Sequence, residues 1–169
     1  MKPAASIIAV LAVTFVAACT VKKPPPPEPS PATADDAALQ TCLHGSRSPD
    51  DRPATIQACG VAVESQALMP AQRLRALKAR AGLYELSRKY QDAINDYTRL
   101  VRDNPRDDVA LKSLGDLFRQ TGKCALSVPY YDRAVRVNPK YEEAYAGRGD
   151  VNLCIKDDQN AISDYTQAL

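Results

Sequence analysis

The sequence is short of the residues and apolar runs on which several protein classes depend. Its 169 residues include no tryptophan, two phenylalanines and one histidine, His44. The apolar run at residues 7–18 ends well short of the about 20 residues that a helix needs to cross a bilayer. Basic and acidic residues nearly cancel, at 22 and 20, giving a net charge of +2. This balance argues against a strongly basic nucleic-acid binder and against an acidic disordered tail.

Sequence signatures of catalysis are also missing. No Walker loop, GxGxxG, HExxH or GxSxG pattern occurs. Serines and aspartates follow His44, but Gly45, Pro49 and Pro53 predict a turn too flexible to hold a Ser-His-Asp triad. We therefore expect no enzymatic activity, no cofactor and no metal site.

The N-terminus has the features of an export signal. The positively charged start at Lys2 precedes the apolar run, and residues 1–18 have the length and flanks of a secretory signal peptide. The run ends Val16-Ala17-Ala18-Cys19, which resembles the lipobox of bacterial lipoproteins, in which the cysteine is acylated. The sequence thus predicts lipid attachment at Cys19, with ordinary signal cleavage after Ala18 as the alternative.

A proline-rich linker follows, over residues 19–33. Proline lacks an N–H and fixes φ, so the run of residues 24–31 favours an extended polyproline-II spacer. By resemblance to sorted lipoproteins, Thr20 after the cysteine implies the outer membrane of a Gram-negative bacterium, facing the periplasm. Because the remaining chain is almost neutral, we expect acyl chains rather than electrostatics to provide most of the membrane attachment.

A repeat of 34 residues organises the rest of the chain. Tyr97, Tyr131 and Tyr165 are separated by 34, and so are Pro105 and Pro139. The same register relates two columns of small residues, Ala81–Gly115–Gly149 and Ala93–Ser127–Ala161. Small residues where helices cross, large residues beside them and a closing proline predict units of two helices, the first at residues 74–87 and 90–103.

Residues 74–169 resemble the tetratricopeptide repeat family. The resemblance implies an all-α stack of helical hairpins, an α-solenoid, with units at 74–107, 108–141 and 142–169, the last lacking its end. Residues 34–73 are similar to a degenerate leading hairpin. The residues expected to pack the repeats are Ala81, Ala93, Tyr97, Gly115, Tyr131, Gly149, Ala161 and Tyr165.

Four positions depart from the family pattern. Arg80 and Arg148 replace a leucine, and Asn152 replaces an aromatic residue. Pro129 falls inside a second helix, where a proline costs about 3 kcal/mol. We therefore expect that helix to begin late, near Ser127, or to be distorted there.

The sequence has five cysteines, and the assignment of Cys19 to lipid attachment leaves an even number for disulfides. Cys42, Cys59, Cys124 and Cys154 remain for an oxidising compartment, and they allow three pairings. In a tetratricopeptide stack, the start of one second helix lies beside the end of the next first helix, which favours Cys124–Cys154 and leaves Cys42–Cys59 within the leading hairpin. Four reduced thiols are the alternative, and no close cysteine pair supports zinc.

The family resemblance implies a concave groove lined by the first helices. By register, the candidate groove residues are Arg75, Lys78, Glu85, Val109, Lys112, Asp116, Arg119, Glu143, Asp150 and Leu153. Some relatives grip a peptide carboxylate with lysines and asparagines in this groove. Lys78 fits that pattern, but Gly82 and Ser113 stand where asparagines are needed, so we expect no such clamp.

These features predict a non-enzymatic envelope lipoprotein that acts as an adaptor for proteins or peptides. The alternative is a redox-active or redox-sensing periplasmic protein that uses its cysteines, although the sequence has no C-x-x-C motif. Ile162, Tyr165 and Leu169 are expected to lie at an uncovered end of the stack. A dimer contact, a partner or further sequence would cover that end.

Overall fold

The computed structural model describes residues 34–45 and 47–169, and these residues form eight α-helices and no strand. The predicted signal peptide, Cys19 and the linker lie outside the described residues. The helices are α1 (Ala34–His44), α2 (Arg52–Glu64), α3 (Pro70–Leu86), α4 (Tyr90–Asp103), α5 (Asp108–Gln120), α6 (Cys124–Val137), α7 (Glu142–Cys154) and α8 (Asp158–Gln167).

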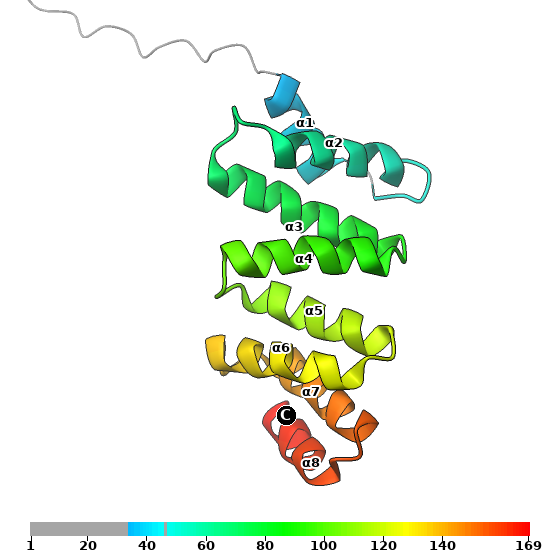
Figure 1. Ribbon diagram of the computed structural model, residues 1–169, viewed down its shortest axis with the longest axis vertical. Helices are drawn as coiled ribbons and strands as arrows, with labels where there is room; N and C mark the ends of the chain where they lie inside the picture. The colour runs from blue at the N-terminus through cyan, green and yellow to red at the C-terminus, as the bar shows by residue number, and fades with distance from the viewer. Residues whose placement is uncertain (1–33, 46) are drawn as a thin grey trace, which may run out of the picture. The chain divides into compact units, whose positions relative to one another are not determined.

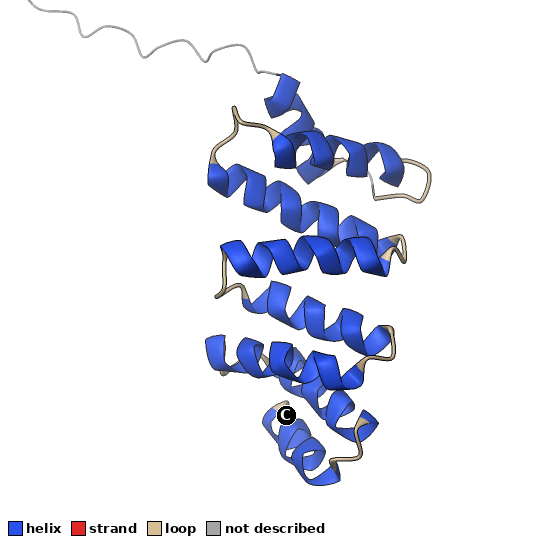
Figure 2. Cartoon of the chain, in the orientation of Figure 1, coloured by secondary structure: helices blue, strands red, loops and turns tan. Residues whose placement is uncertain are grey.

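The helices form four hairpins that follow one another in chain order from α1 to α8 (Figure 1). Short loops join helices throughout, as Figure 2 shows. Each helix contacts the next in sequence, and first helices also touch across units, as α1 does with α3 and α5 with α7. The predicted all-α repeat stack is confirmed, and α1 and α2 pack against each other ahead of the repeat units.

The repeat columns form the core of the stack. Ala81, Ala93, Tyr131 and Ala161 are fully buried, and Tyr97 is 5% exposed. Gly115 and Gly149 lie where a β-carbon would meet the ring of the tyrosine in the same unit, at 2.7 Å from Tyr131 and 2.9 Å from Tyr165 respectively. The small-residue columns therefore let the second helix approach the first, as predicted.

The turns within the three repeat units, between α3 and α4, α5 and α6, and α7 and α8, share one backbone feature. Arg88, Gly122 and Lys156 all have positive φ, at 56°, 74° and 65°. The amides on either side bond back to carbonyls in the last turn of the helix, so the left-handed residue closes each helix end. Only Gly122 suits this conformation sterically; the two basic residues adopt it at a cost.

Two helix boundaries differ from the sequence prediction. α3 begins at Pro70, four residues before 74, because Pro70 occupies a first-turn position where its missing N–H is not needed and Gln72 bonds back to the Met69 amide. α6 begins at Cys124 and continues through Pro129, so the expected late start near Ser127 is wrong. The Gly122 turn sets where α6 begins, and the proline removes only one amide from the helix near its first turns.

Arg80 and Arg148 replace leucine because each has an acidic partner in the following helix. Arg80 forms a two-pronged ion pair with Asp96, with both contacts at 2.7 Å. Arg148 pairs in the same way with Asp164, at 2.6 and 3.0 Å. In the middle unit, the corresponding positions hold Leu114 and Tyr130, so an apolar pair takes the place of the ion pair.

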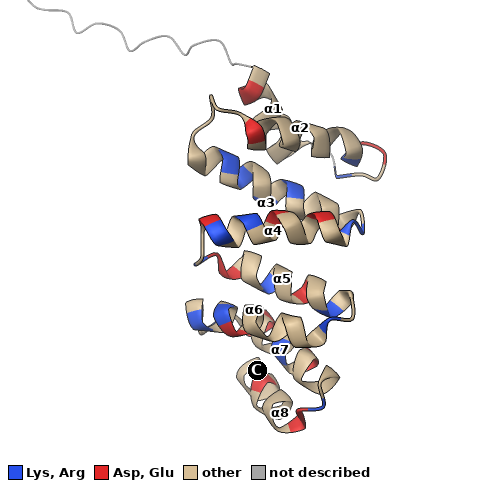
Figure 3. Ribbon diagram, in the orientation of Figure 1, with Lys and Arg blue, Asp and Glu red and all other residues tan. Residues whose placement is uncertain are grey.

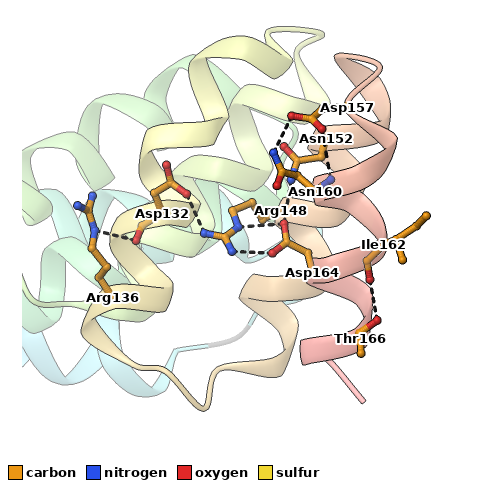
Figure 4. A network of polar contacts seen from close by, with 9 residues as sticks. All are labelled: Asp132, Arg136, Arg148, Asn152, Asp157, Asn160, Ile162, Asp164 and Thr166. Atoms are coloured by element: carbon orange, nitrogen blue, oxygen red, sulfur yellow. Dashed lines mark hydrogen bonds and ion pairs between the residues drawn. The ribbon is translucent and has the colours of Figure 1, made fainter.

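The third unit extends its ion pair into a network (Figure 4). Arg148 also reaches Asp132 of the preceding unit at 2.8 Å, and Asn152 donates to Asp164 at 2.8 Å. Asp164 is 3% exposed, so its negative charge depends on these donors. Asn152, the predicted departure from an aromatic residue, is thus the partner of a buried carboxylate.

Two disulfides join neighbouring helices. Cys42 of α1 bonds to Cys59 of α2, and Cys124 at the start of α6 bonds to Cys154 at the end of α7. These are the pairings that the repeat stack predicted. Loops of this size stabilise by about 3 kcal/mol each in the chain-entropy model. Since each bond fastens neighbouring helices, its position favours a structural role.

Candidate functional site

A cavity of about 780 Å³ opens where the first helices of three hairpins meet. Its walls come from α1, α3, the turn before α4 and the end of α5, and the lining residues are Leu43, Arg47, Arg75, Lys78, Ala79, Gly82, Glu85, Leu86, Arg88, Tyr90 and Gln120. The predicted groove residues Arg75, Lys78 and Glu85 therefore come together in one site. The cavity is well within the size range of peptide or small-ligand sites.

Gly82 makes the space for this cavity. At the corresponding positions of the next two units, Asp116 accepts a hydrogen bond from Tyr131, and Asp150 accepts one from Tyr165 at 2.8 Å. With no side chain at Gly82, Tyr97 bonds instead to Glu85, one turn further along α3, at 3.2 Å. The first unit therefore has open space at Gly82, where the other two units have the side chains of Asp116 and Asp150.

The cavity is lined by an excess of positive charge. Lys78 is neutralised by Asp107, with nitrogen–oxygen distances of 2.9 and 3.0 Å. Within the described chain, the side chains of Arg47, Arg75 and Arg88 have no carboxylate within ion-pair distance. Leu43, Leu86 and Tyr90 supply apolar surface beside them. The site therefore suits a ligand that carries both negative charge and an apolar group.

The other predicted groove charges form a separate ion-pair cluster. Lys112 contacts Asp116 at 2.8 Å, and Arg119 lies between Asp116 at 3.7 Å and Asp150 at 3.5 Å. The cluster links α5 to α7 and neutralises most of its own charge. Val109, Glu143 and Leu153 are exposed and do not line the cavity.

Burial changes the acid–base properties of groups in and below the groove. Burial raises the pKa of Glu85, and the hydrogen bond from Tyr97 only partly offsets this. Burial raises the pKa of Tyr97 to about 12, with the negative charge of Glu85 adding to the effect. The same cause, together with Asp116, raises the pKa of Tyr131. Both phenols stay protonated far above neutral pH.

The tyrosines predict a loss of stability in alkali. A raised folded-state pKa stabilises the fold below the unfolded-state value near 10, and this contribution is lost as pH rises toward 12. We expect urea unfolding at pH 9 and pH 11.5 to show that wild type loses about 2 kcal/mol more than Tyr97→Phe. Equal losses in the two proteins would contradict the buried, protonated state of Tyr97.

Sequence reasoning missed part of the site and one packing residue. The missed cavity residues are Leu43 and Arg47 of the leading hairpin, Arg88 of a turn and Tyr90 at the start of α4. All four lie outside the first helices of the repeat units, from which the groove was predicted. Gly147 was also missed, although a β-carbon there would lie 2.5 Å from the Tyr131 ring. The 34-residue column Ala79–Ser113–Gly147 could have revealed it.

Metal binding has no support in the structure, because no three His, Cys, Asp or Glu side chains of the described residues group suitably for an ion.

Comparisons with known proteins agree with this architecture. The crystal structure of MamA superposes with a TM-score of 0.66 at 16% identity, covering 77% of this chain and 75% of MamA. A MamA RS-1 ArsTM double mutant gives 0.69 at 14% identity, covering 79% and 72%. The first TPR of Spaghetti (RPAP3), bound to the HSP90 peptide SRMEEVD, gives 0.57 at 26% identity, covering 60% and 80%. The comparison with curated proteins gives no match.

The family comparison covers more than half of the sequence. The tetratricopeptide repeat model matches residues 79–123 and 112–169, which include the three predicted units apart from the start of the first. Its repeat agrees with the 34-residue register and with the hairpins of the structure. The chain therefore belongs to the tetratricopeptide repeat family, an all-α scaffold for protein–protein interaction.

Proposed function

We propose that this protein is a lipid-anchored adaptor of the bacterial envelope, and that its cavity binds an anionic segment of a partner protein. The observation that carries the proposal is the cavity between α1, α3 and α5, where Arg47, Arg75 and Arg88 lack acidic partners in the described chain beside an apolar surface. Arginine binds carboxylates through two parallel hydrogen bonds, which makes it well suited to acidic peptides.

The mode of binding differs from a lysine–asparagine clamp. Lys78 is already paired with Asp107, and Gly82 leaves an empty space where a polar side chain could stand. The ligand would therefore be held by arginines at the rim, while an apolar side chain enters between Leu43, Leu86 and Tyr90. A segment that alternates Glu or Asp with leucine meets both requirements.

Binding to a labelled peptide tests this site. We expect an acidic peptide that alternates Glu and Leu to bind the chain in a fluorescence anisotropy titration, and a Lys–Leu peptide of equal length not to bind. The double variant Arg75→Glu/Arg88→Glu should weaken binding about tenfold or more, because it reverses two rim charges. Both side chains are exposed, so the fold should remain intact.

The matched control is Arg106→Glu/Arg136→Glu, which makes the same charge change at exposed positions outside the cavity. If this control weakens peptide binding as much as the cavity variant, the attraction is general and the site is wrong. Equal binding of the acidic and basic peptides would also reject it.

Anchoring is a separate part of the proposal and is supported by the lipobox resemblance at Cys19 and the proline-rich sequence after it. None of the described helices combines the length and the hydropathy that a bilayer-spanning segment requires. Labelled palmitate should enter the wild-type protein in bacterial cells but not the Cys19→Ser variant. Equal labelling of the two would contradict the anchor.

A further inference from the structure

A second set of basic residues repeats with the register of the fold. Arg99 and Arg133, Arg102 and Arg136, and Arg106 and Lys140 are each 34 residues apart. They lie toward the C-terminal ends of α4 and α6 and in the turns that follow, so two successive units present the same cations. Figure 3 shows Lys and Arg at these helix ends. We call these six residues the basic face.

Most of the positive charge on the basic face is not neutralised. Arg99 pairs with Glu64 at 3.0 Å, and Arg102 has only an exposed contact with its neighbour Asp103 at 3.3 Å. Arg133 and Arg136 donate to the backbone carbonyls of Pro105 and Asp132, which hold the guanidinium groups without cancelling their charge.

Arg106 and Lys140 are exposed. In the part of the chain that the structure describes, neither they nor Arg133 and Arg136 form an ion pair.

Two cations of the basic face share a hollow. Arg102 of α4 and Arg133 of α6 line a cavity of about 290 Å³, together with Val101, Pro105, Leu114 and Tyr130. Thr98 also lines this cavity, so both charged residues of its wall are basic and most of the remaining lining is apolar. A phosphate group would meet two arginines there, and attached hydrocarbon would meet apolar surface.

Helix capping explains only part of this arrangement. A cation in the last turn of a helix interacts favourably with the helix dipole, which accounts for Arg102 and Arg136. Arg106 and Lys140 lie beyond the helix ends, and Arg133 lies a full turn before one. The helix dipole therefore does not explain why Arg106, Arg133 and Lys140 are basic.

We infer that the basic face docks on the anionic phospholipid headgroups of a membrane. This inference rests on the proposed lipid anchor, because a membrane is the polyanion that the anchor would keep within reach. Residues 20–33, if extended, span about 43 Å at roughly 3.1 Å per residue. Such a tether raises the local concentration of lipid at the domain surface, so even a weak basic face becomes effective.

The basic face is not evident from the net charge of the chain, which is close to zero. The near-neutral composition predicted that electrostatics would contribute little to membrane attachment. The charges are unevenly distributed. Asp107, Asp116 and Asp150 are paired with basic residues of α3 and α5, whereas several cations on α4 and α6 have no acidic partner in the described chain. The lipid would hold the protein at the membrane, and the basic face would orient the stack on it.

Vesicle co-sedimentation tests the basic face directly. The chain from residue 19 onward, carrying Cys19→Ser to remove the lipid site, is mixed with vesicles of phosphatidylcholine alone or with 30% phosphatidylglycerol, a proportion of about one anionic lipid in three. We expect binding only to the anionic vesicles, and loss of binding as salt rises from about 0.05 to 0.5 M.

Arg106→Glu/Arg136→Glu should weaken this binding by at least about tenfold, since each basic residue near the surface contributes appreciably. Arg75→Glu/Arg88→Glu is the control with equal charge change and should bind as the unmodified chain does. Circular dichroism of both variants checks that the helices persist.

Equal loss in the two variants, equal binding to both vesicles, or no binding to anionic vesicles at low salt would each overturn the inference. The palmitate and peptide experiments report on the anchor and the cavity independently, so failure of the basic face can be told from failure of the proposed function.

Discussion

Asp164→Ala should lower the free energy of unfolding by about 3 kcal/mol. The carboxylate accepts three hydrogen bonds, two from Arg148 and one from Asn152, and its side chain is only 4% exposed. Removing it leaves the Arg148 side chain, which is 22% exposed, with Asp132 as its remaining acidic partner. Urea unfolding followed by circular dichroism measures the loss, and α7 and α8 should unfold first because the lost hydrogen bonds join these two helices.

The residues of the middle unit indicate a variant that should restore the stability lost in Asp164→Ala. The positions of Arg148, Asn152 and Asp164 are held there by Leu114, Phe118 and Tyr130, whose two aromatic rings stack with centroids 5.3 Å apart. The triple variant Arg148→Leu/Asn152→Phe/Asp164→Tyr should therefore recover to within about 1 kcal/mol of wild type, since apolar replacements of buried ion pairs are often neutral or stabilising.

Asp132 is left exposed to water in this variant, as its side chain is 41% exposed already. A triple variant as unstable as Asp164→Ala would show that apolar packing cannot replace the ion-pair network of the third unit.

The sequence predicted the architecture well because the same residue pattern recurs in each unit, so each recurrence adds evidence for the same pair of helices. A tyrosine at 97, 131 and 165 with small residues sixteen positions earlier is weak evidence once and strong evidence three times. The same register placed Cys124 beside Cys154. Where one unit differs from its neighbours, the register was a poorer guide, as with the start of α3 and the passage of α6 through Pro129.

The candidate site was harder to predict because it depends on a difference between repeats. Register alone put residues from all three units in one groove, but the cavity exists only where Gly82 replaces the aspartate of the other units. It is completed by Arg47, which lies in the loop after α1, and by Arg88, whose position is held by Gly122 in the next unit. Arg80 and Arg148 likewise looked like defects until their carboxylate partners could be seen across the hairpin.

Gly147→Ala should destabilise the stack by about 3 kcal/mol, the upper part of the range for overpacked cores. An added β-carbon would lie 2.5 Å from Cε1 of Tyr131 and 2.8 Å from its Cζ and hydroxyl oxygen. The ring cannot retreat, because its other side faces Gly115, where a β-carbon would meet it at 2.7 Å. Tyr131 is fully buried and bonded to Asp116, so α7 itself would have to move away from α6.

Gly82→Ala is the matched control, with the same substitution in the middle of a first helix. The nearest atom to its added β-carbon is the Tyr97 hydroxyl oxygen at 3.9 Å, an ordinary contact. Alanine favours the helix over glycine by about 1 kcal/mol, so this variant should be more stable than wild type.

Thermal and urea unfolding of the two variants should therefore move in opposite directions. A Gly147→Ala protein as stable as wild type would mean that Tyr131 is not wedged between two glycines. The close approach of α5, α6 and α7, which aligns the first helices into one groove, would then need another cause.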